Sequence, residues 1–175
     1  MSTPVILGLG SNLGDSRRII LDAVKALEAV LSDLRSASLY ETAPLHVTDQ
    51  ARFINTAVCG FYPGGQSSDE NRGSDQSLKS ARELLSAIHE IEARFGRDRA
   101  RERRWGERFL DIDILLFGNF VCKENDLEIP HARLKERRFA LEPLLELLPD
   151  AAEPGTGLSY SAICDALPDQ GVSKW

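Results

Sequence analysis

The chain has 175 residues, of which 42% are hydrophobic, and a formal net charge of −6. This length fits one domain or at most two small ones, and the apolar fraction is sufficient to bury a core without disulfides. The net negative charge argues against a protein whose whole surface binds nucleic acid, and no apolar run approaches membrane-spanning length. We therefore expect neither nucleic acid nor a membrane as a partner.

The cysteines indicate a reducing compartment. Cys59, Cys122 and Cys164 are odd in number and include no Cys-x-x-Cys spacing, so we expect free thiols and no zinc site. The N-terminus has no basic region and only a short apolar run over 5–9, which predicts no signal peptide. We expect a cytoplasmic protein with no obligate protein partner.

The first half of the chain alternates strands and a helix. Residues 4–10 form a short apolar run ended by glycine, which is typical of a buried strand. Asp15 or Ser16 can cap a helix whose apolar face extends to Leu31. Residues 36–42 and 53–61 are predicted as the next strands, with a loop over 43–52 between them.

The second half begins with a segment, 63–77, that has no apolar side chain. Such composition does not support packing, so we expect a mobile surface insertion. A capping box at 80–83 predicts the start of a helix that Gly96 ends. A strand over 109–117, a turn at 118–119, a return strand over 120–122 and helices over 139–148 and 158–168 follow.

The order strand, helix, strand, strand, helix, strand predicts the fold class. It is typical of an α+β protein with a ferredoxin-like sandwich, in which helices pack on a mostly antiparallel sheet. We expect residues 1–175 to form a single domain.

Arginine is concentrated in one stretch of the chain. Seven of the 16 arginines lie within 94–108, against three acids, which gives this stretch a local charge of +4. Guanidinium groups match phosphate oxygens in pairs, so the stretch is a candidate phosphate site. The alternative is a solvated loop whose charges pair internally. Trp105 argues against the solvated loop, because an indole needs a flat partner to cover it, but the residue alone does not decide between stacking on a heteroaromatic ring and plain packing.

Two carboxylates follow at once, at Asp111 and Asp113. In a strand, residues i and i+2 point to the same face, so both carboxylates would project together while Ile112 and Ile114 enter the core. Neighbouring like charges raise each other's pKa unless a cation neutralises them, and a pair of divalent ions would do so. The alternative is the solvated face of an edge strand.

Two further motifs are less specific. Gly8, Gly10 and Gly14 do not have the spacing of a dinucleotide or P-loop motif, and glycines that ease a strand-to-helix turn explain them better. His131 precedes three arginines, at 133, 137 and 138, so it could donate to a phosphate or could hold a loop.

Together, these motifs resemble the 6-hydroxymethyl-7,8-dihydropterin pyrophosphokinases of folate biosynthesis. The matching segments are 10–14, 40–45, 53–57, 129–131, 137–139 and, most specifically, 104–118, in a resemblance that covers roughly 3–150. The resemblance implies a ferredoxin-like fold and transfer of the terminal diphosphate of ATP to the pterin hydroxymethyl group, with release of AMP.

The resemblance also implies a role for individual residues. Asp111 and Asp113 would hold two Mg²⁺ ions, and Arg97 and Arg108 would stabilise charge on the transferring diphosphate. The nucleotide would lie near His89, Glu92, Arg104, Arg108, Ile114, His131 and Arg137. The pterin would lie among Thr42, Ala43, Pro44, Leu45, Phe53, Asn55, Trp105 and Phe139, with Trp105 closing over it. Arg99, Arg101 and Arg103 receive no individual role.

Two other functions can be tested against this one. A metal-dependent glycosyltransferase could use the Asp-x-Asp pair to bind a nucleotide sugar, but it would leave the pterin residues unexplained. A ferredoxin-like RNA-binding module could use the arginines on phosphates, but its aromatic signature is missing and the net charge is unfavourable.

Overall fold

The computed structural model describes residues 2–44, 49–64, 70–98 and 106–175. The helices in this part are α1 (Ser16–Leu27), α2 (Glu70–Arg94), α3 (Arg138–Leu147) and α4 (Tyr160–Ala166), with a 3₁₀ turn at Leu134–Glu136. The strands are β1 (Ser2–Ser11), β2 (Ser32–Ser36), β3 (Tyr40–Thr42), β4 (Phe53–Pro63), β5 (Asp111–Phe117), β6 (Cys122–Lys123), β7 (Glu128–Ile129) and β8 (Ser173–Lys174).

The main sheet is antiparallel and has the strand order β5-β1-β4-β3-β8, with β2 paired to β4 beside β3. The central pair is long: β1 and β4 are in register from Ser2 opposite Pro63 to Ser11 opposite Ile54. β5 lies at one edge, next to β1. This topology confirms the predicted α+β class.

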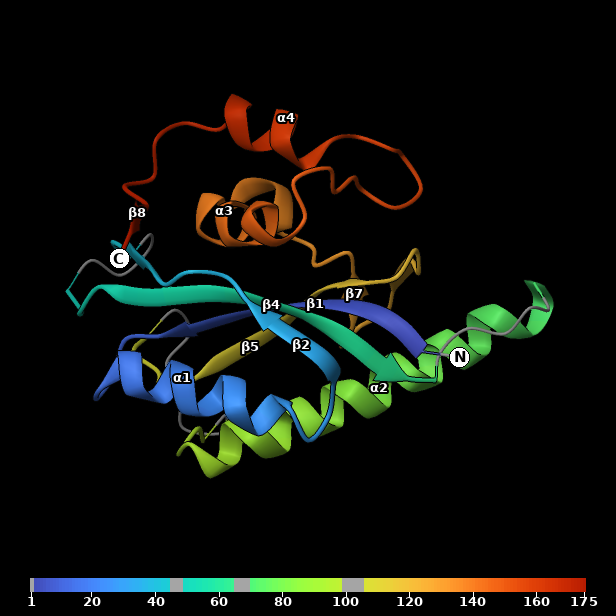
Figure 1. Cartoon of the computed structure of the whole chain (residues 1–175), viewed down its shortest axis with the longest axis horizontal. Coiled ribbons are helices and arrows are strands. Elements are labelled where there is room, and N and C mark those ends of the chain that lie inside the picture. Colours follow the sequence, from blue (N-terminus) through green and yellow to red (C-terminus); the bar gives the residue numbers. More distant parts are fainter. Residues whose placement is uncertain (1, 45–48, 65–69, 99–105) are drawn as a thin grey trace.

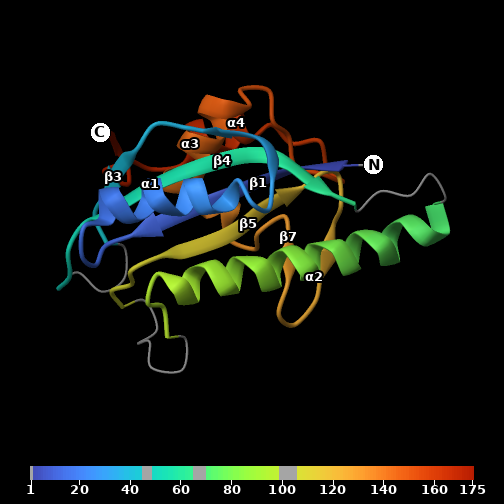
Figure 2. The ribbon, with the colours of Figure 1, turned by 60° about the horizontal axis from the view of Figure 1, so that its bottom comes forward.

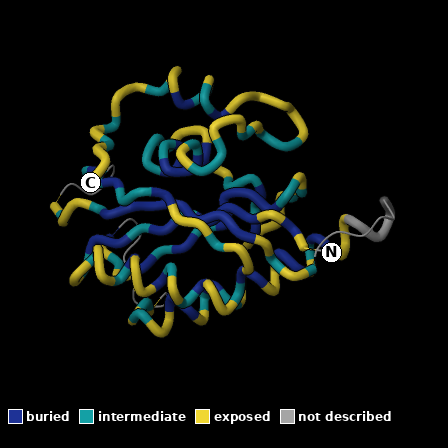
Figure 3. The backbone as a smooth tube through the Cα atoms, viewed as in Figure 1, coloured by how far each residue is buried: buried dark blue, intermediate teal, exposed yellow. Residues whose placement is uncertain are grey.

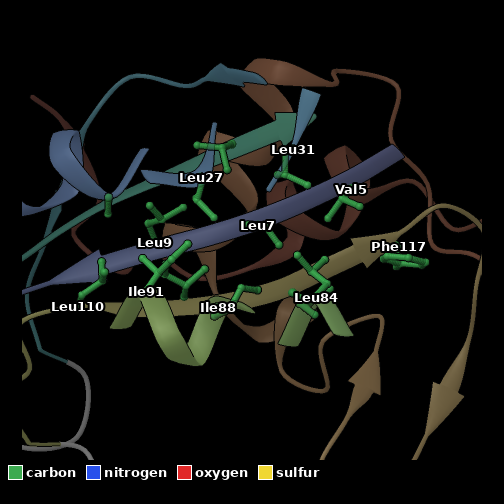
Figure 4. Packing of buried hydrophobic residues seen from close by; sticks show 14 of the residues in the cluster. Val5, Leu7, Leu9, Leu27, Leu31, Leu84, Ile88, Ile91, Leu110 and Phe117 are labelled. Atoms are coloured by element: carbon green, nitrogen blue, oxygen red, sulfur yellow. The ribbon is translucent and has the colours of Figure 1, made fainter. Parts of the chain in front are cut away.

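Helices cover both faces of the sheet. Figures 1 and 2 show α1 and α2 against one face, with α3 and α4 against the other. The α1/α2 face carries the larger core, in which α1 and α2 pack against β1 and β5 (Figure 4). Its labelled members are Val5, Leu7, Leu9, Leu27, Leu31, Leu84, Ile88, Ile91, Leu110 and Phe117.

The α3/α4 face carries a smaller core, which leaves part of the sheet uncovered. Its residues come from Ile6 and Ala57 on the sheet and from Leu141, Leu144 and Tyr160 on the helices. The buried sheet thus lies between two partly exposed helical layers (Figure 3). Where α3 does not cover the sheet, polar side chains of β5 and β4 can line a pocket.

Local sequence explains the start of α1. The carboxylate of Asp15 accepts a hydrogen bond from the backbone N–H of Arg18 at 3.1 Å, which caps the first turn. Ile20, Ala23 and Leu27 are buried at helical spacing and face the sheet.

The structure corrects the expected start of α2. This helix begins at Glu70, so residues 70–77 are helical and Ser80 lies inside the helix, where the predicted capping box has no function. Ser77 and Ser80 are buried although they are polar. The rest of the predicted insertion includes 65–69, which lie outside the described residues.

Two strand predictions were also wrong. The expected strand over 36–42 is interrupted: β2 lies almost wholly before it and ends at Ser36, residues 37–39 are not strand, and β3 covers only 40–42. Residues 120–122 do not pair back on β5, because β6 pairs instead with β7. None of the described helices is both long and apolar enough to cross a lipid bilayer.

The C-terminal segment, residues 150–175, returns to the sheet. It forms α4 and then β8, which pairs antiparallel with β3 at the sheet edge (Figure 1). Glu146 of α3 joins these elements, because its carboxylate accepts hydrogen bonds from the hydroxyls of Tyr40 and Ser38, at 2.6 and 2.8 Å. Lys174 of β8 lies 3.3 Å from the same carboxylate.

We predict a pH-dependent contribution of Glu146 to stability. Burial opposes ionisation of Glu146, but the hydrogen bonds from Tyr40, Ser38 and Lys174 outweigh it and lower the pKa from 4.5 to about 2. A carboxyl whose pKa is lower in the folded state stabilises the fold above its unfolded pKa, and this contribution is lost as the pH falls towards the folded pKa. The free energy of unfolding of the wild type should exceed that of Glu146→Gln at pH 7, and the difference should shrink between pH 4.5 and 2 in urea titrations. An equal difference at pH 7 and pH 2 would contradict this prediction.

Candidate active site

A pocket lies on the α3 side of the sheet, beside the edge strand β5. The space between its walls amounts to about 900 Å³, a volume that includes open solvent at its mouth. Strands β1, β3, β4 and β5, the segment after β7 and the start of α3 all contribute to its walls. The lining residues are Gly8, Leu9, Gly10, Thr42, Ala43, Gln50, Phe53, Asn55, Thr56, Arg108, Asp111, Asp113, Leu115, His131, Arg137, Phe139 and Ala140.

Two glycines of β1 make room in the pocket floor. A Cβ atom on Gly8 would lie 3.3 Å from the side chain of Leu115, and one on Gly10 would lie 3.0 Å from Oδ1 of Asn55. The interpretation of Gly8 and Gly10 as turn glycines was therefore wrong. Of the three, Gly14 has a positive φ, of 74°, and it lies in the turn before α1.

β5 presents Asp111 and Asp113 to the pocket. Ile112 and Ile114 point to the other face and are buried in the α1/α2 core, as the alternation predicts. β5 is an edge strand, yet its carboxylates are not simply solvated, because the side chain of Asp111 is only 25% exposed. The two acids therefore share one concave site.

Two arginines neutralise Asp111. One carboxylate oxygen accepts from Arg97 at 2.5 Å, and the other accepts from Arg108 at 2.7 Å. Burial alone would raise the pKa of Asp111, but the two guanidinium groups outweigh burial and lower it. Asp111 is therefore held ionised.

Glu92 fixes Arg97 from behind. Its side chain is 1% exposed and its Oε1 accepts from the backbone N–H of Ile112 at 2.8 Å and from the guanidinium of Arg97. Arg97 itself is only 7% exposed and bridges Glu92 to Asp111. Glu92 thus joins the end of α2 to β5, and it is not among the residues that line the pocket.

Within the described part of the chain, Asp113 lacks such close partners. His131 Nε2 and Arg137 Nη1 each lie 3.7 Å from its Oδ2, which is beyond direct hydrogen-bond distance. Burial and the neighbouring charge of Asp111 raise the pKa of Asp113 to about 7, although Arg137 opposes the change. Asp113 is a carboxylate that a further cation in the pocket would stabilise.

The hydrogen bonds of His131 assign its tautomer. Its Nδ1 accepts from the backbone N–H of Arg133 at 3.1 Å, so the proton of the neutral ring is on Nε2, which faces Asp113. The backbone N–H of His131 donates to Leu115 at 3.0 Å, which holds the residue beside β5. Burial and the positive charge of Arg137 lower the pKa of His131 to about 4.

The other end of the pocket combines amide, hydroxyl and aromatic groups. Nδ2 of Asn55 donates to Oγ1 of Thr42 at 2.9 Å, and both side chains are buried. Phe53 and Phe139 supply apolar walls, and the guanidinium of Arg137 lies 5.5 Å from the centre of the Phe139 ring. Oδ1 of Asn55 lies next to Gly10 in the pocket floor.

The remaining predicted site residues lie elsewhere or are not described. The side chain of Ile114 is buried in the α1/α2 core, and His89 is a partly exposed residue of α2 outside the pocket lining. Pro44 is described and partly exposed, next to Ala43 in the lining. Leu45, Arg104 and Trp105 lie outside the described residues.

The protein groups available to a metal ion are few. Across residues 2–44, 49–64, 70–98 and 106–175, no cluster of three or more His, Cys, Asp or Glu side chains is arranged to hold one. Asp111 and Asp113 offer two neighbouring carboxylates, so most ligands of any cation here would come from substrate or water.

The comparisons with known proteins agree with this geometry. The sequence model of 7,8-dihydro-6-hydroxymethylpterin-pyrophosphokinase (HPPK) matches residues 6–64 and 73–149. The chain belongs to the HPPK family. The break in the match, at 65–72, falls within the polar insertion that the sequence predicts.

Named HPPK relatives differ in their length. The chain is 34% identical over 177 residues to 2-amino-4-hydroxy-6-hydroxymethyldihydropteridine pyrophosphokinase of Bacillus subtilis, covering 100% of this chain and 92% of the relative. It is 38% identical to the mitochondrial folate synthesis bifunctional protein of Pisum sativum, covering 89% of this chain. The chain spans about a quarter of that relative's length (27%).

A solved structure supports the fold. Plasmodium falciparum HPPK-DHPS superposes with a TM-score of 0.68 at 14% identity, over 94% of this chain and 44% of that one. At this identity the likeness concerns the fold alone.

Sequence reasoning missed one polar residue of the HPPK signature at 10–14. Asn12 is buried, and its Nδ2 donates to Oε1 of Gln50 at 3.0 Å and to the carbonyl of Ala51 at 3.2 Å. Its Oδ1 accepts from the backbone N–H of Arg108 at 2.9 Å. Asn12 thus ties the segment before β4 to the segment before β5. In the sequence, only the position of Asn12 between Gly10 and Gly14 could have indicated that its side chain is buried.

We predict that His131 is a neutral Nε2–H donor throughout the physiological pH range. Since its pKa is lowered to about 4, the imidazole should gain a proton only when the pH falls towards that value. The ¹⁵N and ¹³C shifts of the ring, followed by NMR titration, would identify the tautomer and the midpoint. A midpoint at or above pH 6.5, or a proton on Nδ1, would contradict the assignment.

Proposed function

We propose that this chain transfers diphosphate from ATP to the hydroxyl of 6-hydroxymethyl-7,8-dihydropterin, with release of AMP. The observation that carries the proposal is the division of one pocket into two ends. One end holds two carboxylates among Arg108, Arg137 and His131, and the other holds the amide and aromatic groups around Asn55 and Phe139. Membership of the HPPK family supports the same reaction.

At the phosphate end, the protein supplies positive charge and hydrogen-bond donors. Arg108, Arg137 and the Nε2–H of His131 all face the part of the pocket beside β5. Charge-assisted bonds from these groups would bind the β- and γ-phosphates and stabilise charge that spreads over the transferring group. Arg97, held by Glu92, would act with Arg108 on the diphosphate by exchanging its contact with Asp111.

The donor set at Asp111 and Asp113 fits Mg²⁺. Both ligands are hard carboxylate oxygens, and burial and the charge of Asp111 raise the pKa of Asp113, an effect that a bound cation would oppose. Two protein carboxylates leave the other positions for phosphate oxygens and water. Asp111 and Asp113 would hold two Mg²⁺ ions, which would supply positive charge against the ATP phosphates.

At the pterin end, the protein supplies an aromatic slot for the ring and polar groups that would recognise its edge. Phe53 and Phe139 would lie against the ring system, while the amide of Asn55 and the hydroxyl of Thr42 would bond its polar edge. Ala43 lines the slot, and Pro44, Leu45 and Trp105 would complete it, the last two from outside the described residues. His89, Glu92, Arg104 and Ile114 keep their expected place around the nucleotide as part of this proposal.

The reaction requires no protein nucleophile. The pterin hydroxyl oxygen attacks the β-phosphorus of ATP and forms a P–O bond, while the bond from that phosphorus to the α-phosphate oxygen breaks and AMP leaves. Such a transfer needs positioning and electrostatic stabilisation more than covalent chemistry. This chain covers 92% of the Bacillus relative, which supports the proposal that a unit of this size acts without an obligate partner.

The decisive assay incubates the protein with Mg²⁺, ATP and the hydroxymethyl-dihydropterin and separates the nucleotides. We expect AMP to form in proportion to the pterin diphosphate, with no AMP when the pterin is omitted. ADP as the product, or AMP formation that does not depend on the pterin, would contradict the proposal. Turnover of a nucleotide sugar would favour the glycosyltransferase, and salt-sensitive RNA binding without ATP consumption would favour the RNA-binding module.

A further inference from the structure

The start of α3 carries two pocket residues but lacks a cap of its own. Arg137 occupies the N-cap position and makes no side-chain capping hydrogen bond. The first N–H groups of a helix have no partner within the helix, so they need one from elsewhere. Arg137 and Phe139, which flank Arg138 at this point, both line the pocket.

A side chain from the C-terminal segment supplies this partner. Oε1 of Gln170 accepts from the backbone N–H of Arg138 at 3.0 Å, and its Nε2 donates to the backbone carbonyl of Glu136 at 2.8 Å. A single amide group therefore binds the backbone on both sides of Arg137. Rotation of the Arg137 backbone away from the pocket would break both bonds.

The C-terminal segment is itself held in place around Gln170. Asp169 accepts from the backbone N–H of Gly171 at 2.8 Å, which closes a turn at Gln170. On the far side, β8 pairs with β3, and the backbone N–H of Trp175 donates to Leu39 at 2.8 Å. β3 ends at Thr42, a lining residue, so the segment contacts two walls of the pocket, at β3 and at the start of α3.

Arg138 completes the attachment. Its Nη1 donates to the carbonyls of Cys164 and Leu167, at 3.0 and 3.1 Å, at the end of α4. Neighbouring residues at the start of α3 therefore contact different parts of the molecule. Arg137 and Phe139 line the pocket, and Arg138 binds the C-terminal segment. Gln170, Cys164 and Leu167 lie beyond residue 149, where the HPPK match ends.

We propose that Gln170 is a positioning residue for diphosphate transfer, which orients Arg137 and Phe139 by fixing the backbone on either side of Arg137. The proposal rests on the proposed function, in which Arg137 binds phosphate and Phe139 contacts the pterin. It assigns the C-terminal segment a role in the reaction, although no atom of Gln170 needs to touch a substrate.

The test compares Gln170→Ala with the wild type and with Gln170→Glu. Loss of two hydrogen bonds at a positioning site should lower kcat/KM about 5- to 30-fold in the alanine variant. Glutamate keeps the acceptor for the backbone N–H of Arg138 but has no donor for the carbonyl of Glu136, so it should restore only part of the loss. Thr156→Ala is the matched control, because it removes another exposed hydrogen bond of the C-terminal segment, to Glu153 at 2.6 Å. It should keep the wild-type kcat/KM.

A second background separates positioning from simple loss of stability. In Arg137→Ala protein, Gln170→Ala should lower kcat/KM by a smaller factor than in the wild type, because one of the two residues through which it acts is already gone while Phe139 remains. An equal loss in both backgrounds, or wild-type activity of Gln170→Ala, would overturn the proposal.

Amide exchange at Arg138, measured by NMR, tests the contact without any substrate. Faster exchange in Gln170→Ala than in the wild type supports the proposed contact, and unchanged exchange overturns it. Absence of pterin-dependent AMP formation by the wild type would instead contradict the proposed function, so the two failures are distinguishable.

Discussion

The site depends on the burial of negative charge at the edge of a sheet. Asp111 is neutralised by Arg97 and Arg108, and Glu92 holds Arg97 while it accepts from the backbone of Ile112. Removing one partner from a buried ion pair typically costs about 3–5 kcal/mol, because the other charge is left uncompensated. This network therefore fixes the end of α2, the start of β5 and the pocket in one arrangement.

The negative charge of Asp113, beside this network, is neutralised less completely than that of Asp111. Among the described residues, Arg137 and the neutral ring of His131 each lie 3.7 Å from the carboxylate of Asp113, and burial and Asp111 raise its pKa. A substrate that brings both cations and phosphates would neutralise these groups together. The cations would bind Asp111 and Asp113, and the phosphates would bind Arg97 and Arg108 once these release Asp111. The ligand-free charges thus favour the ATP complex that we propose.

The sequence predicted features that depend on periodicity and composition. Alternation in β5 was sufficient to place Asp111 and Asp113 on one face and Ile112 and Ile114 on the other. The start of α2 could not be predicted, because residues 70–77 lack apolar side chains and the helix extends there against local preference. The contacts of Asn12 and Gln170 join segments 38 and 32 residues apart, so they depend on the completed fold. The prediction that Gly8 and Gly10 ease a turn was wrong because these glycines, which lie in β1, leave space for the side chains of Leu115 and Asn55, and this depends on the folded structure.

The central claim is that Asp111 and Asp113 hold the divalent cations that accompany ATP. The most direct measurement is Mn²⁺ binding, followed by electron paramagnetic resonance, in the presence of a non-hydrolysable ATP analogue. We predict that the wild type binds Mn²⁺ with the analogue and that Asp111→Ala and Asp113→Ala each weaken this binding about 10- to 100-fold while circular dichroism shows an intact fold. Binding close to that of the wild type in both folded variants would contradict the account.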